Sequence, residues 1–156
     1  MRAVIQRVKR AGVDVLEEGV PPRCAAQIEA GALVLVAVSV GDGAEDAEWL
    51  ASKIAAMRIF EDSDGKMNLS LGESGGWALA VSQFTLYGNM KKGNRPSFNR
   101  SAPPGDALGL YEKFCELLGE RLQGRVARGQ FGAMMDVQLV NDGPVTLILD
   151  SRERGF

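Results

Sequence analysis

The sequence predicts one α/β domain over residues 1–156, with two β-sheet layers and two main helices that cover one side, a three-layer β/β/α arrangement. A chain of 156 residues is long enough to bury one sizeable core. Six or seven segments have the apolar patterns of strands, whereas only two have the periodicity of long helices. These segments do not alternate as in parallel βαβ units, so we expect both helices on the same side of the sheets.

The N-terminal half is predicted to contain strands and the first helix. Ala3–Val8 is predicted as a strand, with Val13–Leu16 as its hairpin partner or its continuation. Leu33–Val40 is almost entirely apolar and rich in valine, which indicates a strand buried on both faces. Glu45–Arg58 is predicted as an amphipathic helix, because its apolar residues recur at helical spacing and its acidic residues stand at the start. Glu61–Gly65 is too short for a calcium-binding loop, so we interpret it as a solvated turn.

The C-terminal half is predicted to contain one long helix, one long irregular segment and three strands. Ala107–Leu122 carries its apolar residues on one helical stripe, so we expect Cys115 on that stripe to be a core residue rather than a reactive one. Gly88–Gly105 shows little periodicity. The predicted strands are Trp77–Leu86, Ala133–Val140 and Val145–Leu149.

Composition narrows the chemistry that the chain could perform. It contains no histidine, which excludes a Ser-His-Asp triad and a Cys-His pair. Cys24 and Cys115 are distant in sequence and have no histidine to join them, so we expect neither a metal nor a cofactor. No apolar run approaches the ~20 residues that span a bilayer, and the N-terminus has no signal-peptide core. We therefore expect a cytoplasmic protein without membrane association.

Ser82–Tyr87 (SQFTLY) carries small hydroxyl residues at the end of an apolar run. Ser82 and Thr85 have the chemistry of nucleophiles, but no histidine can activate them, and a lysine or a carboxylate would have to do so. Backbone N–H groups at the strand end could instead form an oxyanion hole. The alternative is an ordinary amphipathic strand end, with Phe84 and Leu86 pointing inward.

Asn141–Thr146 (NDGPVT) joins two predicted strands. On the residues alone we interpret it as a hairpin turn, because Asp-Gly between strands favours a turn and a proline is tolerated as the first residue of a strand. The alternative is that Gly143 and Pro144 project a rigid edge without long side chains into a binding site.

Two further segments have both a structural and a functional interpretation. Lys91–Arg100 contains four basic residues and no acidic one, which is typical of a solvated loop or of a phosphate contact. Gly129–Met135 (GQFGAMM) has the residues of a packed core, and core packing is the favoured interpretation. Its alternative is an exposed platform for a flat base.

Taken together, these motifs resemble those of the D-aminoacyl-tRNA deacylase family, and the resemblance covers essentially the whole chain. The motifs that carry it are MRAVIQRV at Met1–Val8, RIFEDSDGKMNLS at Arg58–Ser70, SQFTLY at Ser82–Tyr87, KGNRPSF at Lys92–Phe98, GQFGAMM at Gly129–Met135 and NDGPVT at Asn141–Thr146. The resemblance implies the family's β/β/α fold and a cytoplasmic homodimer without a cofactor. It also implies hydrolysis of the ester that joins a D-amino acid to the 3′-terminal adenosine of tRNA, and acceptance of glycine on a mischarged tRNA.

The resemblance also implies a role for individual residues. Gly143 and Pro144 would form a cis peptide bond that enters the partner subunit's pocket and excludes L-amino acids, and Arg7 would brace it. Thr85 is expected to position the substrate rather than to attack it, since no histidine is present. The residues implied in the catalytic pocket are Ser82, Gln83, Phe84 and Thr85.

Contacts to the tRNA are implied at two places. The residues implied to hold the terminal adenosine are Phe131, Gly132, Ala133 and Met135, and the candidate phosphate contacts are Lys91, Lys92 and Arg95. Arg128 departs from the threonine expected at its position, which bears on the contact with the tRNA end. Two other functions stay open on the residues alone: a non-catalytic nucleic-acid-binding dimer, and an esterase or peptidase that acts on small molecules.

Overall fold

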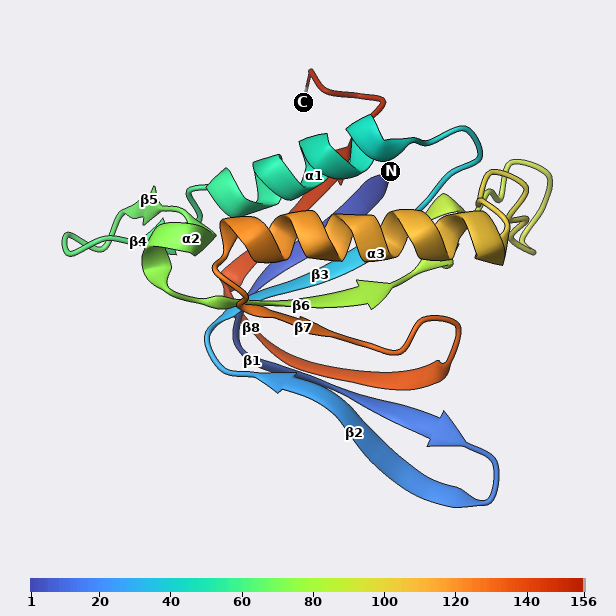
Figure 1. Cartoon of the computed structure of the whole chain (residues 1–156), viewed down its shortest axis with the longest axis horizontal. Helices are drawn as coiled ribbons and strands as arrows, with labels where there is room; N and C mark the ends of the chain where they lie inside the picture. Colours follow the sequence, from blue (N-terminus) through green and yellow to red (C-terminus); the bar gives the residue numbers. More distant parts are fainter. Residues whose placement is uncertain (156) are drawn as a thin grey trace.

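Strands β1 (Arg2–Glu17) and β8 (Met134–Asp150) run antiparallel over almost their whole lengths in the computed structural model, which describes residues 1–155 (Figure 1). On its other side, β1 pairs with two different strands. Its N-terminal half pairs with β3 (Gly31–Ala37) and its C-terminal half with β2 (Val20–Ile28). The two long strands therefore connect all other parts of the sheet.

The sheet extends from β3 by parallel strands. β6 (Trp77–Ser82) pairs with β3, and β7 (Val126–Arg128) pairs with β6. The strand order is β2-β1-β3-β6-β7, with β8 on the remaining side of β1. A second, two-stranded sheet consists of β4 (Phe60–Glu61) and β5 (Met67–Leu69).

The six-stranded sheet bends over itself and encloses two apolar cores. Along β1, Ala3 and Ile5 belong to the core under the helices, whereas Ala11 and Val13 belong to a second core between the two halves of the sheet. Strands β3 and β6 alternate between the two cores and are buried on both faces, as predicted for Leu33–Val40. The two β layers are thus halves of one continuous sheet, and the strand passes from one layer to the other near Arg7.

Helices α1 (Ala44–Ala56) and α3 (Pro104–Arg121) lie side by side over one face of the sheet, and the β1–β2 hairpin extends from the opposite side (Figure 1). Both helices fall within a few residues of their predicted bounds, and a short helix, α2 (Leu71–Ser74), follows β5. Cys115 is buried in the first core, and this burial raises the pKa of its thiol to about 11. Among residues 1–155, no helix is long and apolar enough to cross a membrane.

The α/β class and the layered arrangement with helices on one side are therefore confirmed. Val13–Leu16 continues the first strand and does not form a hairpin with it. Strand β2 was not predicted, because Pro21 and Pro22 interrupt its pattern; prolines are tolerated there since this end of β2 is an exposed sheet edge.

Candidate functional site

The motif Ser82–Thr85 lies where β6 leaves the sheet. The N–H of Gln83 donates to the carbonyl of Val36 at 2.7 Å, and β3 ends one residue later, at Ala37. Without a neighbouring strand to pair with, the chain closes into a 3₁₀ turn, η1 (Phe84–Tyr87). The predicted strand over Trp77–Leu86 is thus wrong beyond Ser82.

The same turn reverses the predicted direction of its side chains. Phe84 was expected to point inward as part of a strand, but it is 56% exposed, while Tyr87 is buried. The alternation of a strand ends where η1 begins, so the inward direction expected for Phe84 does not apply, and Leu86, also expected inward, is half-buried. The exposed part of the motif is therefore Phe84 and Thr85, and Gln83 is half-buried.

Residues Ser82–Thr85, which we call the catalytic turn after the role that the resemblance implies, offer hydrogen-bond donors but no acid or base. The N–H groups of Phe84 and Thr85 begin the turn, where a helical segment has no internal acceptor for them. The side-chain amide of Gln83 donates to the Thr85 hydroxyl oxygen. In the described chain, no titratable side chain hydrogen-bonds to these four residues. The turn is suited to stabilising an oxyanion and not to activating a nucleophile.

The segment Gly129–Met135 lies beside the end of β6. The N–H of Gly129 donates to the carbonyl of Ala80 at 2.9 Å, and a Cβ on Gly129 would lie 3.0 Å from Met135 Sδ and 3.6 Å from Val81 Cγ2. A side chain at residue 129 would push these two residues apart. Because residue 129 is a glycine, the start of β8 can approach β6, the strand that leads to the catalytic turn.

The four residues implied at the tRNA end differ in their packing. Phe131 is half-buried against Tyr111, with ring centroids 5.7 Å apart, and Met135 packs at the edge of the second core. Gly132 has φ +75° and closes the turn between β7 and β8, in which the N–H of Ala133 donates to Gln130. Phe131 and Met135 are thus partly packed against the cores, in agreement with the core packing that the residues alone favour.

Gly143 and Pro144 lie in a bulge of β8 and not in a hairpin. Gln6 pairs with Thr146 and Val8 pairs with Asn141, so β8 advances five residues where β1 advances two. Four residues, Asp142–Val145, therefore leave the ladder opposite the single residue Arg7, and we call them the Gly-Pro bulge. The predicted hairpin is wrong because β8 pairs with β1 on both sides of the bulge.

Within the bulge, Gly143 has φ +119° and both Gly143 and Pro144 are exposed. The Gly143-Pro144 peptide bond is cis, the geometry that the resemblance implies.

Arg7 of β1 contacts the Gly-Pro bulge through its guanidinium. Its guanidinium is almost fully buried; it donates to the Ile59 carbonyl at 2.6 Å and to the Asp142 carbonyl at 3.3 Å, and it lies 3.1 Å from the Asp142 carboxylate. A Cβ on Gly143 would lie 3.1 Å from Arg7 Nη2. A buried arginine with this many partners fixes the base of the bulge.

The catalytic turn and the Gly-Pro bulge lie apart within this chain. The bulge stands opposite Arg7, which is level with Ala78 on β6, four residues before Ser82. Strands β1 and β3 lie between β8 and β6. With about 4.8 Å between strands and about 3.3 Å per residue, the separation is on the order of 20 Å.

The basic segment projects from the catalytic turn as an exposed loop. Lys91, Lys92 and Arg95 are all exposed. The loop is closed by paired backbone bonds between Asn89 and Ser97, at 2.8 and 2.9 Å. Its far end is fixed to the turn, because the rings of Phe98 and Phe84 meet edge to face at 5.0 Å, and the Ser101 hydroxyl donates to the Phe84 carbonyl. The three cations are therefore presented beside the turn.

Comparison with known proteins identifies the family. Residues 4–150 match the family model described as D-Tyr-tRNA(Tyr) deacylase. A D-aminoacyl-tRNA deacylase from Akkermansia muciniphila is 54% identical over 154 residues, which is 99% of each chain, and one from Thermus aquaticus is 55% identical over 154 residues, covering 99% of this chain and 97% of the relative. The chain belongs to this family.

Solved structures of similar proteins agree with the fold of this family member. A protein named c-Myc DNA Unwinding Element Binding Protein superposes with a TM-score of 0.87 and 39% identity, covering 96% of this chain and 98% of that one. A probable eukaryotic D-amino acid tRNA deacylase superposes with a TM-score of 0.78 over 95% and 97% of the two chains. At 17% identity, the second likeness concerns the fold alone.

Sequence reasoning did not single out the residues that shape the Gly-Pro bulge beside Arg7. The Asn141 side chain accepts from the N–H of Val145 at 3.1 Å and donates to the Thr146 hydroxyl at 3.0 Å. Gln6 donates to the same hydroxyl at 3.3 Å. An asparagine just before Asp-Gly-Pro was the available signal, since asparagine side chains commonly bond to backbone a few residues ahead.

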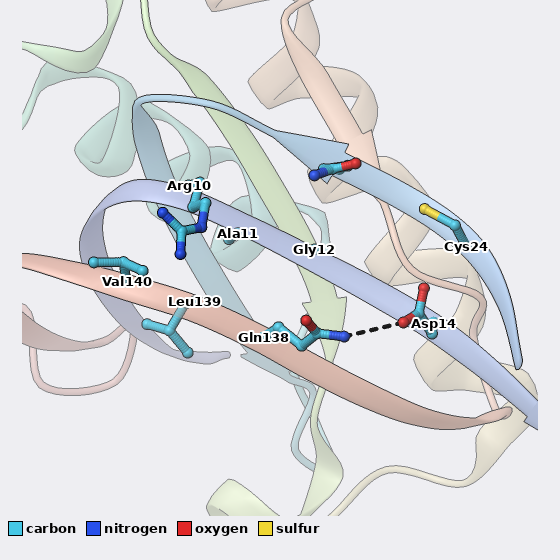
Figure 2. A pocket seen from close by; sticks show the side chains of 9 residues that line it. Arg10, Ala11, Gly12, Asp14, Cys24, Gln138, Leu139 and Val140 are labelled. Atoms are coloured by element: carbon cyan, nitrogen blue, oxygen red, sulfur yellow. Dashed lines mark hydrogen bonds between the residues drawn. The ribbon is translucent and has the colours of Figure 1, made fainter.

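A surface hollow of about 390 Å³ in the deacylase chain does not coincide with either motif. It lies across strands β1, β2 and β8, where Figure 2 shows Arg10, Cys24 and the hydrogen bond from Gln138 to Asp14. These residues point away from the second core, because their strand neighbours Ala11, Val13 and Leu139 pack into it. None of the residues Ser82–Thr85 lines this hollow.

Proposed function

We propose that this chain hydrolyses the ester of D-aminoacyl-tRNA, releasing free tRNA and a D-amino acid. The observation that carries the proposal is the catalytic turn, with its unpaired backbone N–H donors, its amide-held Thr85 hydroxyl and its lack of a titratable partner. Membership of the deacylase family supports the same reaction. An aminoacyl ester is already activated, so a site without a general base is sufficient for its hydrolysis.

In this proposal the N–H groups of Phe84 and Thr85 stabilise the oxyanion that forms when water attacks the ester carbonyl. One such donor contributes roughly 10²–10³-fold to the rate. Thr85 positions the substrate, since Gln83 holds its hydroxyl and no base can remove its proton. The substrate's own 2′-hydroxyl stands next to the ester and is available to assist.

We further propose that the working site is shared by two subunits. D- and L-amino acids carry the same groups, so only a rigid obstacle in one direction can separate them. The exposed Gly143 and Pro144, braced by Arg7, offer such an obstacle, but about 20 Å separates them from the catalytic turn of their own subunit. The bulge of one subunit would therefore enter the pocket of the other, and an L side chain would collide with it.

The face that a second copy would cover carries an apolar row. Ile148 of β8 pairs with Val4 of β1, and Val4 pairs with Leu35 of β3. The strand neighbours of Val4 point toward the helices, so the row lies on the opposite side, and Ile148 is 59% exposed. Burial of this row against a second copy would stabilise a homodimer.

The terminal adenosine and the phosphates of the tRNA would bind residues around the catalytic turn. Phe131, Gly132, Ala133 and Met135 would receive the terminal adenosine, because this segment lies against the end of β6. The exposed Lys91, Lys92 and Arg95 would contact phosphates. Glycine has no side chain to collide with the bulge, so mischarged glycyl-tRNA would also be hydrolysed, and the cytoplasm is where such tRNAs occur.

A deacylation assay with D-tyrosyl-tRNA and L-tyrosyl-tRNA tests the proposal. We expect the wild type to hydrolyse the D ester at least 100-fold faster than the L ester. A Gly143→Ala variant should lower this ratio at least tenfold, because φ +119° strains an alanine and its Cβ would press on Arg7 and Val145. Equal rates for both esters in the wild type would contradict the proposal.

Gly65→Ala is the matched control for this variant. Gly65 also has a positive φ of +74°, but it lies in the turn between β4 and β5 and a Cβ there meets no atom within 4 Å. It carries a comparable backbone cost far from the bulge, so its D/L ratio should equal that of the wild type.

A second candidate function is nucleic-acid binding without catalysis. The name of one structural relative, c-Myc DNA Unwinding Element Binding Protein, and the exposed basic loop favour it. Binding of tRNA with no loss of either ester in the same assay would support this function instead. Loss of small esters regardless of tRNA would indicate a general esterase.

A further inference from the structure

Tyr87, at the end of η1, lies between two segments that are distant in sequence, the start of β1 and the end of the basic loop. Its ring is 98% buried, and the guanidinium carbons of Arg2 and Arg100 lie 4.8 Å and 5.7 Å from the ring centroid. Arginines at such distances are attracted to the electron-rich face of an aromatic ring. The tyrosine therefore anchors the end of η1, which continues the catalytic turn, between the start of β1 and the end of the basic loop.

Arg2 makes the only side-chain hydrogen bond to this part of the turn in the described chain. Its Nη1 donates to the Leu86 carbonyl at 3.0 Å. The same guanidinium holds the buried Asp150 carboxylate at the end of β8, through Nε at 2.9 Å and Nη2 at 2.8 Å. One planar group thus ties β1, β8 and η1 together, and its fork of donors fixes its orientation.

The turn needs such support because its own hydrogen bonds are few. Inside it, the N–H of Leu86 donates to Gln83 at 3.2 Å and the N–H of Gly88 donates to Thr85 at 2.9 Å. Short 3₁₀ segments have poor hydrogen-bond geometry and are weakly stable alone. Phe84 and Thr85 are themselves exposed, and beyond the turn Phe84 is held only by the Phe98 ring and the Ser101 hydroxyl within the described chain.

We propose that Arg2 is a positioning residue that, through Tyr87 and the Leu86 carbonyl, fixes the backbone N–H groups of Phe84 and Thr85 where the oxyanion forms. This inference rests on the proposed hydrolysis at the catalytic turn and adds to it a residue outside Ser82–Thr85, which acts on the turn through Leu86 and Tyr87. The expected consequence of losing Arg2 is a change in kcat without a change in KM. Loss of the contact loosens the turn and lowers kcat, while the surfaces that bind tRNA, and hence KM, are unchanged.

Arg2→Lys is the variant that tests this. A lysine keeps the charge beside Asp150, but a single ammonium cannot also reach Leu86 and stack on Tyr87 in the fixed geometry of a guanidinium. Small displacements of catalytic groups are costly, since about 1 Å can lower a rate 10²-fold. We expect a kcat about tenfold lower for D-tyrosyl-tRNA, with KM within twofold of the wild type.

Arg152→Lys is the matched control. Arg152 also pairs with a buried carboxylate, Asp42, at 2.9 Å, and also donates to a backbone carbonyl, but that carbonyl belongs to Val40 and not to the turn. It should lose comparable stability with kcat unchanged. An equal loss of kcat in the two variants would mean that Arg2 acts only through stability and would overturn the inference.

Amide hydrogen exchange gives a readout that does not depend on activity. In Arg2→Lys, the amides of Leu86 and Gly88 should exchange at least tenfold faster than in the wild type, and in Arg152→Lys they should not. Unchanged exchange at both amides would overturn the inference, whatever the activity. If the wild type fails to hydrolyse D-tyrosyl-tRNA, the proposed function fails, and the exchange rates still decide whether Arg2 holds the turn.

Tyr87→Leu provides a second route if Arg2→Lys does not fold. It removes the ring but leaves the pair of Arg2 and Asp150 in place. The same faster exchange and the same selective loss of kcat are expected from it, and wild-type values for both would overturn the inference.

Discussion

Tyr87 and Tyr111 are both buried tyrosines, but only one of them uses its hydroxyl. Tyr111 donates to the Ala80 carbonyl at 2.9 Å, whereas the Tyr87 hydroxyl has no partner within residues 1–155. Burial raises the pKa of both phenols, so both stay neutral at physiological pH. An unpaired buried hydroxyl costs about 1–3 kcal/mol, whereas a paired one contributes about 1 kcal/mol.

Opposite effects are therefore expected from the same substitution at the two positions. Tyr87→Phe keeps the ring and should raise the free energy of unfolding by about 1 kcal/mol, and Tyr111→Phe should lower it by about 1 kcal/mol. Urea denaturation measures both. A loss of stability in Tyr87→Phe would show that its hydroxyl has a partner after all.

At the residue scale, the sequence predicted which reactions the side chains could perform better than it predicted which residues contact one another. The missing histidine excluded an activated nucleophile, and Cys115 is buried as its helical stripe predicted. Leu108, placed on the same stripe, is 38% exposed because it lies in the first turns of α3, near the exposed loop. The contacts of Arg2 with Tyr87 join residues 85 positions apart, and no local pattern carries such information.

At the scale of elements, the closest approach in the sheet occurs where β3 and β6 begin. A Cβ on Gly31 would lie 1.9 Å from the Trp77 carbonyl oxygen and 2.7 Å from its nitrogen. Both atoms belong to the backbone, so no side chain can rotate away. Gly31→Ala must therefore separate two central strands.

We expect Gly31→Ala to lower the free energy of unfolding by 3 kcal/mol or more, above the 1–3 kcal/mol typical of overpacking. Gly12→Ala is the control, since Gly12 lies in the same sheet and its Cβ would meet nothing closer than 3.7 Å. It should change stability by less than about 1 kcal/mol. Equal stabilities of the two variants in urea would contradict the close approach.

Local patterns predicted elements well where packing and propensity agree. Both long helices and the doubly buried β3 follow from apolar periodicity. The Gly-Pro bulge has the composition of a hairpin turn, and only the long partner strand β1 keeps β8 running past it. Likewise, β6 ends where its neighbour β3 ends, and the residues Trp77–Leu86 alone contain no information on that position.

At the scale of the whole molecule, the proposed dimer makes a prediction about the apolar row. Ile148 and Met67 are each 59% exposed, but only Ile148 lies in this row. A lysine at position 148 would have to bury its charge in the interface, which is costly without a partner. Ile148→Lys should therefore weaken dimerisation at least tenfold, while Met67→Lys should not change it.

Sedimentation across a range of concentrations measures this, and deacylation should fall together with the dimer if the bulge acts in the partner's pocket. A wild type that sediments as a 16.7 kDa monomer would contradict the shared site. The layered class was predictable from the number of strands and helices. That one sheet supplies both layers was not, because it depends on pairing between residues 118 to 148 positions apart.

The pairing of β1 with β8 also dictates the order in which this chain can fold during synthesis. Strand β1 is among the first elements to be made and β8 is the last of the twelve. Until β8 is synthesised, one entire edge of β1 stays open, and both cores lack a wall. Pairings of such long sequence separation form slowly, and open edges invite association with other chains. The nascent chain therefore depends on its final strand, and a ribosome that stalls before Met134 leaves a sheet with an unprotected edge.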